Sequence, residues 1–162
     1  MKRKSLFLLL MILPIMISYT LTYAMGDRFI THLTDENTSV MTLAQGQALF
    51  TLSEDGMTMS YRVIVANIKN VTMAHIHVAD APGVNGDPVV WIHPANPPPV
   101  LIPGRSQGTL VTGSFTADDF VNHIEVKDME DLLHAIHEGR AYLNVHTTAN
   151  PGGEIRGYLR MR

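Results

Sequence analysis

The stretch "QALFTLSEDGMTMSYRVIVANI", Gln47–Ile68, decides the fold class of this chain. Apolar and polar residues alternate on both sides of Glu54–Gly56, and this period of two is typical of β-strands. After the turn, one strand face carries Met57, Met59, Tyr61, Val63 and Val65. Two alternating runs joined by a glycine-containing turn predict an antiparallel hairpin with one face in a hydrophobic core.

The same pattern predicts further short strands along the chain. The candidates are Arg28–Leu33, Val71–Ala79, Val89–Ile92, Gly108–Phe115, Ala141–His146 and Glu154–Met161. Turn-forming residues separate them, so we expect a turn at Lys69–Asn70 and a loop over Asp80–Pro88. The proline-rich segment His93–Gln107 should not join a central ladder of the sheet, because proline cannot donate a ladder hydrogen bond.

One segment, "KDMEDLLHAIHEG", has helical spacing instead. Its apolar residues are Met129, Leu132, Leu133 and Ile136, and the segment ends at a glycine, a natural C-cap. We therefore expect one short helix at about 128–138, packed on an all-β domain. Eight or so strands with a single helix predict a β-sandwich of the Greek-key type.

The first 24 residues have the pattern of an export signal. The basic residues Lys2–Lys4 precede an apolar run, Ser5–Tyr19, and Thr22–Ala24 supplies small residues at cleavage spacing. The run is short for a bilayer span, so we expect residues 1–24 to be a cleaved signal peptide. Residues 25–162 then form one secreted, extracytoplasmic domain that meets the membrane only during export. The alternative is an uncleaved signal anchor.

Charge and cysteine content exclude several functions. The chain has 12 lysines and arginines against 15 acidic residues, and removing the three at Lys2–Lys4 leaves 9 against 15, a formal charge of −6. We expect no nucleic-acid partner, because such a partner requires a basic surface. The sequence contains no cysteine, which excludes disulfides, a thiol nucleophile and thiolate metal ligands.

Three histidines stand on predicted strand faces that avoid the core. His75 and His77 in "AHIHV" alternate with the apolar residues of that strand, so both imidazoles project to one side, about 7 Å apart. His146 in "AYLNVH" also lies opposite the apolar residues of its strand. Whether these polar faces converge depends on the order of the strands, which alternation does not give.

An H-x-H pair on a strand can hold a metal ion together with a third imidazole from another strand. Imidazoles without thiolates favour copper or zinc, and a carboxylate from Glu154 would broaden the choice toward iron or manganese. The alternative is a structural network in which each ring bonds a carboxylate or a backbone carbonyl group. Glu154 and Arg156 share a strand face, and they could pair with each other or bond His75 or His77.

The remaining histidines and motifs carry weaker signals. His93 precedes a proline in a loop, His32 and His123 show no pattern, and His134 and His137 flank the apolar stripe of the helix. A Glu/Arg pair beside histidines is compatible with acid–base chemistry. The chain nevertheless shows no nucleophile elbow, no Ser-His-Asp arrangement and no phosphate-binding glycine loop. We therefore expect a binding protein and not an enzyme.

Three segments resemble the CHRD domain, a module first defined in chordin and widespread in exported bacterial proteins. They are "AHIHVADAPGVNGDPVVWI", "GTLVTGSFTADDF" and "LLHAIHEGRAYLNVHTTANPGGEIRGYLR". The similarity extends from about Phe29 to Leu159, is most specific in Gly139–Gly157 and departs from the usual pattern at Asn37–Met41. It implies an immunoglobulin-like, all-β module. The family's polar positions are occupied here by His75, His77, Asn144, His146, Thr147, Glu154 and Arg156.

Together these observations predict a secreted CHRD domain that acts as a binding module for an extracellular ligand or a metal ion. The expected metal ligands are His75, His77 and His146, supported by Asn144, Glu154 and Arg156. The alternative function is copper or zinc binding for storage or for redox chemistry like that of superoxide dismutase. "AHIH" is similar to the paired strand histidines of copper–zinc superoxide dismutase, but the chain lacks that enzyme's disulfide and its His- and Asp-rich zinc loop.

Overall fold

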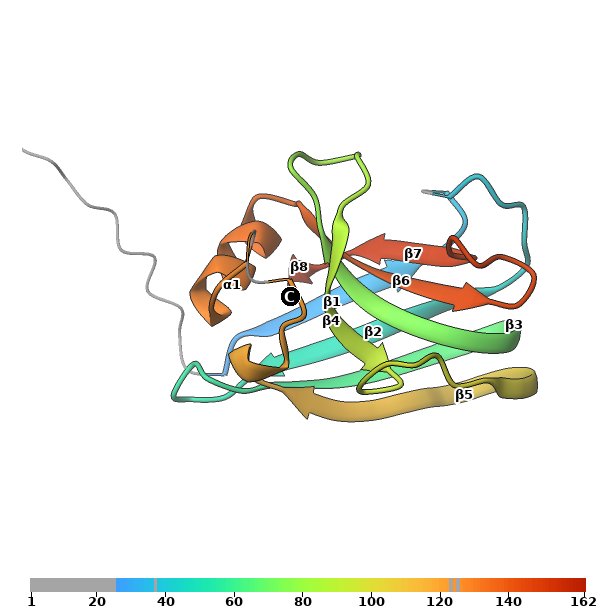
Figure 1. The fold of residues 1–162 in the computed structure, drawn as a ribbon, viewed down its shortest axis with the longest axis horizontal. Coiled ribbons are helices and arrows are strands. Elements are labelled where there is room, and N and C mark those ends of the chain that lie inside the picture. The colour runs from blue at the N-terminus through green and yellow to red at the C-terminus, as the bar shows by residue number, and fades with distance from the viewer. Residues whose placement is uncertain (1–25, 37, 123, 125) are drawn as a thin grey trace, which may run out of the picture.

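The structure, a computed structural model, describes residues 26–36, 38–122, 124 and 126–162 (Figure 1). The expected signal peptide, residues 1–24, and His123 lie outside this part. The strands are β1 (Arg28–Leu33), β2 (Gln45–Leu52), β3 (Met59–Val78), β4 (Asp87–His93), β5 (Ile102–Phe115), β6 (Ala141–Thr147), β7 (Ile155–Tyr158) and β8 (Arg160–Met161). A short 3-10 helix spans Ala117–Asp119, and the single α-helix among the described residues, α1, spans Met129–His137. The all-β prediction with one short helix is confirmed.

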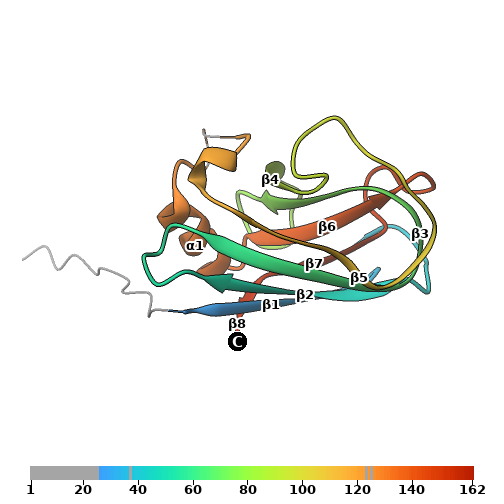
Figure 2. The same cartoon turned by 90° about the horizontal axis from the view of Figure 1, so that it is seen from below.

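Strand β3 is 20 residues long and belongs to both layers of the fold (Figure 2). Its first half pairs with β2 and β5, and its second half pairs with β6 and β4. Between the halves, Asn67 and Asn70 have φ angles of 59° and 52°, a conformation that asparagine tolerates better than most residues. The expected turn at Lys69–Asn70 is therefore wrong, because the chain bends there within one continuous strand that carries register shifts.

Strand β5 includes the end of the proline-rich segment, which the sequence excludes from a central ladder. Its first residues, Ile102–Gln107, pair with β3 around the bend. Within the described part of the chain β5 pairs with β3 alone, so it is an edge strand. Pro103 is tolerated there because an edge strand leaves half of its amide groups without a ladder partner.

The sheet curls back on itself until it nearly closes. The strand order is β7-β6-β3-β2-β1-β8, with β4 and β5 also joined to β3, and every pair is antiparallel. Just after β1, the Thr34 amide donates to the Arg156 carbonyl at 3.2 Å, and the Arg156 amide donates to the Thr34 carbonyl at 2.9 Å. Gly157 is required at this closure, because a Cβ there would collide with the His32 carbonyl and the Thr31 hydroxyl.

The hydrophobic core fills the space between the two layers. Alternate residues of β3 supply it from both halves, namely Met59, Tyr61, Val63, Val65, Ala74, Ile76 and Val78. Helix α1 lies at the end opposite the bend of β3 (Figure 2) and buries Leu132, Leu133 and Ile136. No helix among the described residues has the length and apolar character needed to cross a bilayer. The alternation that fills the core turns His75 and His77 to the outer face of the second layer.

Candidate metal centre

The three predicted histidines converge on the outer face of the second layer. In the antiparallel pairing of β3 with β6, His75 stands opposite Asn144, and Met73 stands opposite His146. Residues two apart on neighbouring strands share one face, so His75, His77 and His146 project to the same side. One nitrogen atom from each ring lies within 4.8 Å of one from each of the others. The order of β3 and β6 thus supplies the convergence that alternation alone could not give.

The cluster is buried although it faces away from the core. The relative exposures of His75, His77 and His146 are 4%, 8% and 6%. Aromatic rings cover two of them. The ring of Trp91 on β4 packs edge-on against His75 at a centroid distance of 4.2 Å, and the ring of Tyr142 stacks on His77 at 5.0 Å with an interplanar angle of 6°. The imidazoles therefore sit in a low-dielectric environment.

Two backbone carbonyl groups fix the protonation of two rings. His77 Nδ1 lies 3.0 Å from the Gly86 carbonyl in the 79–86 loop, and His146 Nδ1 lies 2.8 Å from the Pro151 carbonyl in the 148–154 loop. A carbonyl oxygen can only accept, so both Nδ1 atoms carry a proton. In a neutral ring the other nitrogen, Nε2, then carries the free lone pair. This unprotonated nitrogen is the atom that can bind a metal.

The third ring completes the donor set. His75 Nδ1 lies 3.2 Å from His146 Nε2. In the metal-free protein His75 Nδ1 donates its proton to that unprotonated atom. If that proton moves to His75 Nε2, the same separation suits two nitrogen ligands that bind one ion at about 2.0–2.1 Å with an angle of about 100° between them. The Nε2 atoms of His75 and His77 are buried and have no hydrogen-bond partner in the part of the chain that the structure describes, and such atoms are rare in folded proteins outside binding sites.

Burial keeps the imidazoles neutral at physiological pH. Burial, and after it the neighbouring His146 and His77 rings, lowers the pKa of His75 to about 3. Burial lowers the pKa of His77 to about 4, although the bond to Gly86 acts in the opposite direction. Burial also lowers the pKa of His146. Because metals bind the neutral imidazole, no proton has to be displaced from the cluster at neutral pH.

Glu154 serves the loops around the cluster. Its carboxylate accepts hydrogen bonds from Thr42 Oγ1 at 2.8 Å, Thr147 Oγ1 at 2.7 Å and Asn150 Nδ2 at 3.0 Å. These donors come from the β1–β2 connection, from the end of β6 and from the 148–154 loop. Glu154 therefore positions the loop whose Pro151 carbonyl holds the cluster, and its two oxygen atoms are engaged with these donors.

Asn144 and Arg156 extend the polar row across the sheet. Asn144 stands opposite His75 on one side and opposite Arg156 on the other. The Arg156 guanidinium lies 5.2 Å from the centre of the Tyr142 ring, and its Nη1 donates to Asn85 Oδ1 at 2.7 Å. Both predicted supporting residues thus adjoin the cluster. A guanidinium is always protonated, so Arg156 cannot itself be a metal ligand.

Sequence reasoning missed the two aromatic rings and the two carbonyl groups of the site. Strand parity could have found Tyr142, which precedes Asn144 by two residues and shares its face. Nothing in the sequence marks the carbonyls of Gly86 and Pro151, since any residue has one. His93, a weaker candidate, lies in the structure with its Nε2 2.9 Å from the Val100 carbonyl, a contact within the proline-rich segment.

Fold and site together define an all-β, antiparallel domain that carries a buried cluster of three histidines. The chain belongs to the CHRD domain family, whose model matches residues 29–159. The resemblance noted in the sequence is thereby confirmed. No curated protein and no solved structure matches this chain significantly.

Proposed function

We propose that this CHRD domain is an extracytoplasmic binding module for one transition-metal ion, copper or zinc, held by His75, His77 and His146. The observation that carries the proposal is the anchoring of two ligand rings through Nδ1 to the carbonyls of Gly86 and Pro151. Metal-binding histidines commonly donate their second nitrogen to a carbonyl or carboxylate, which fixes the tautomer and the orientation of the ring.

The donor chemistry selects the metal. Three imidazoles without a thiolate suit copper and zinc, whereas calcium and magnesium require oxygen ligands. Glu154 would have extended the choice to iron or manganese, but its carboxylate is held by Thr42, Thr147 and Asn150. Three protein ligands leave a further coordination position for water or a small molecule, which is compatible with metal transfer or with redox chemistry.

The place of action follows from the N-terminal sequence. The basic, apolar and small-residue regions within residues 1–24 have the order of a signal peptide. The chain has no cysteine, so it forms no disulfide outside the cytoplasm. It also offers no thiolate that would compete with the three imidazoles for the ion. We therefore place metal binding outside the cytoplasmic membrane.

Trp91 provides the direct test, because it is the single tryptophan of the chain and its ring lies against His75. Paramagnetic Cu²⁺ bound to the cluster should quench its fluorescence, and the quenching should saturate at about one ion per chain. The measurement uses the purified protein without a histidine tag. Zinc added in competition should restore the fluorescence if both ions use the same ligands.

Two double variants separate specific binding from adventitious binding. His75→Ala/His77→Ala should abolish saturable quenching. His134→Ala/His137→Ala removes two histidines of helix α1 outside the cluster and should leave the titration unchanged. Equal quenching in both double variants, or no saturable quenching in the unmodified protein, would contradict the proposal and leave the cluster as a structural hydrogen-bond network.

A further inference from the structure

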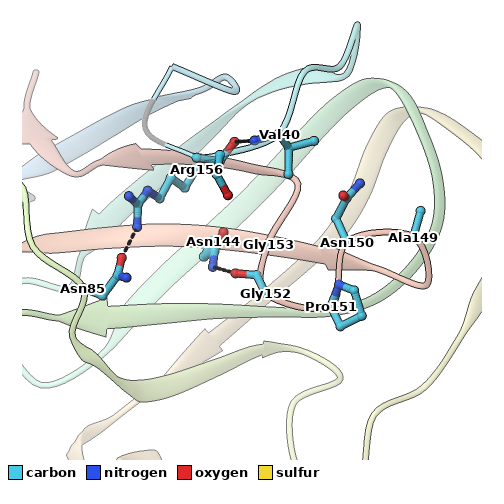
Figure 3. Close-up of a pocket in the computed structure, with 11 residues that line it drawn as sticks. Val40, Asn85, Asn144, Ala149, Asn150, Pro151, Gly152, Gly153 and Arg156 are labelled. Carbon is cyan, nitrogen blue, oxygen red and sulfur yellow. Dashed lines mark hydrogen bonds between the residues drawn. The ribbon is translucent and has the colours of Figure 1, made fainter.

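A polar cleft of about 460 Å³ adjoins the histidine cluster. Three loops meet there above β6 and β7, and they contribute residues 38–40, Asn85 and residues 149–153 to its walls. Figure 3 shows Arg156 reaching toward Asn85 on one side of the cleft and the 148–154 loop on the other, with Asn144 between them. The cleft is distinct from the proposed metal ligands, since none of the three histidines lines it.

Two polar atoms of residues that line the cleft are buried and have no hydrogen-bond partner among the described residues. One is a donor, Nε of Arg156, and the other is an acceptor, Oδ1 of Asn144. Asn144 is 5% exposed. Its Nδ2 atom donates to the Gly152 carbonyl at 3.2 Å, whereas its Oδ1 atom accepts no hydrogen bond from the described residues. Arg156 Nη1 is likewise engaged by Asn85, which leaves the Nε edge of the guanidinium without an acceptor. Unmatched buried atoms of this kind cost stability and require a reason.

The charges of the walls favour an anion. Arg156 is the single charged residue among those that line the cleft, and neither described salt bridge involves it. The Nε edge of an arginine matches a carboxylate, which can accept two parallel hydrogen bonds. The unmatched Asn144 oxygen needs a donor such as a hydroxyl group. The Ser39 hydroxyl and the Asn150 Oδ1 atom can bond further hydroxyls, whereas Asn150 Nδ2 is held by Glu154.

We propose that this cleft binds a small carboxylate that carries several hydroxyl groups, either a sugar acid or a hydroxy acid. The carboxylate accepts from the Nε edge of Arg156, and a hydroxyl donates to Asn144 Oδ1. This second site goes beyond the metal site and does not depend on it, although the two are joined structurally. Asn144 stands opposite His75 in the sheet, and Pro151 belongs both to the cleft and to the support of His146.

Calorimetric titration of the metal-free protein tests this site separately from the metal. D-glucuronate and tartrate represent the two sources of the carboxylate, while acetate and D-glucose each supply one half of the chemistry. At least one of the first pair should bind more tightly than acetate and glucose. Arg156→Gln should weaken that binding by about 10- to 100-fold, the effect of losing a charge-assisted hydrogen bond.

Two further variants serve as controls for Arg156→Gln. Arg156→Lys retains the charge without the Nε edge and should also bind more weakly, whereas Arg62→Gln removes an exposed arginine of the other layer and should change nothing. If the Arg156 variants do not fold, backbone amide shifts in the unmodified protein decide, and ligand-induced shifts should centre on residues 144, 152, 153 and 156. Absence of binding by glucuronate and tartrate, equal binding of acetate, or unchanged affinity in a folded Arg156→Gln variant would overturn the proposal.

Discussion

The Nδ1 atom of His75 lies 3.2 Å from the Nε2 atom of His146, although 71 positions separate the two residues in the chain. The neighbouring strands β3 and β6 create this contact, and the Pro151 carbonyl orients the second ring. The site therefore depends on the register of one strand pair and on the loops that cover it. Changes to either can be separated by experiment from changes to the ligands.

Removing the charge of Glu154 should weaken the fold and spare metal binding. In Glu154→Gln one oxygen that accepts hydrogen bonds becomes an amide donor, so the bonds from Thr42, Thr147 and Asn150 cannot all persist. We expect the free energy of unfolding to fall by about 1–3 kcal/mol in urea denaturation. Thr42→Val, which removes one donor, should cost less. A Glu154→Gln protein of normal stability that no longer binds metal would show instead that Glu154 is a ligand.

The hydroxyl group of Tyr142 should control metal affinity through the loop that it holds. It accepts from the Gly86 amide at 3.0 Å, and the carbonyl of Gly86 orients His77. Tyr142→Phe should therefore raise the dissociation constant for copper by about tenfold, the lower end of such positioning effects. Tyr158→Phe is the matched control, because the Tyr158 hydroxyl holds the same loop farther along, at Gly83. Similar effects of both variants would argue against a specific role for Tyr142.

The metal-free protein should lose stability as the pH falls below about 6.5. The pKa of a histidine in the unfolded chain lies near 6.5, whereas burial lowers that of His75 to about 3 and that of His77 to about 4. Between about pH 6.5 and about pH 4 the unfolded state therefore takes up protons that the folded state does not, and the free energy of unfolding decreases as the pH falls. The loss can reach about 1.4 kcal/mol per pH unit for each buried histidine.

Urea denaturation at several pH values measures this dependence. His77→Gln should flatten the slope by the share of one histidine. A slope that does not change in His77→Gln would contradict the assignment of His77 as a buried neutral ring.

A side chain at position 157 should destabilise the contact between β7 and β1 that nearly closes the sheet. In Gly157→Ala the added methyl group meets the His32 carbonyl, which belongs to the backbone and cannot move aside cheaply. We expect a loss of about 3 kcal/mol or more in the free energy of unfolding. Gly152→Ala is the control, because no atom lies within 4 Å of the added group and the effect should be small. Equal stability of the two variants would show that β1 and β7 do not approach as closely as described.

Much of this fold could be predicted from sequence because alternation reports which residues share a strand face. The hairpin around Glu54–Gly56, the helix near Met129 and the common face of His75 and His77 follow from local patterns. The bend at Asn70 was misinterpreted as a turn, since asparagine serves equally in turns and in bulges of a continuing strand.

The site could be predicted only in part. Its three histidines are visible from parity and from the resemblance to the CHRD family, but their burial is not, because it arises from loops folded over the strand face. The role of Glu154 was equally hidden. Its partner Thr42 lies 112 positions away, and no local pattern connects the two residues.

Measuring the metal content of the protein shows whether His75, His77 and His146 hold an ion. The purified protein, without a histidine tag, is dialysed against copper or zinc and then analysed for bound metal and protein. We expect about one ion per chain for the unmodified protein and none for the folded His75→Ala/His77→Ala variant. Retention of the ion by that variant, or failure of the unmodified protein to retain either metal, would contradict this expectation.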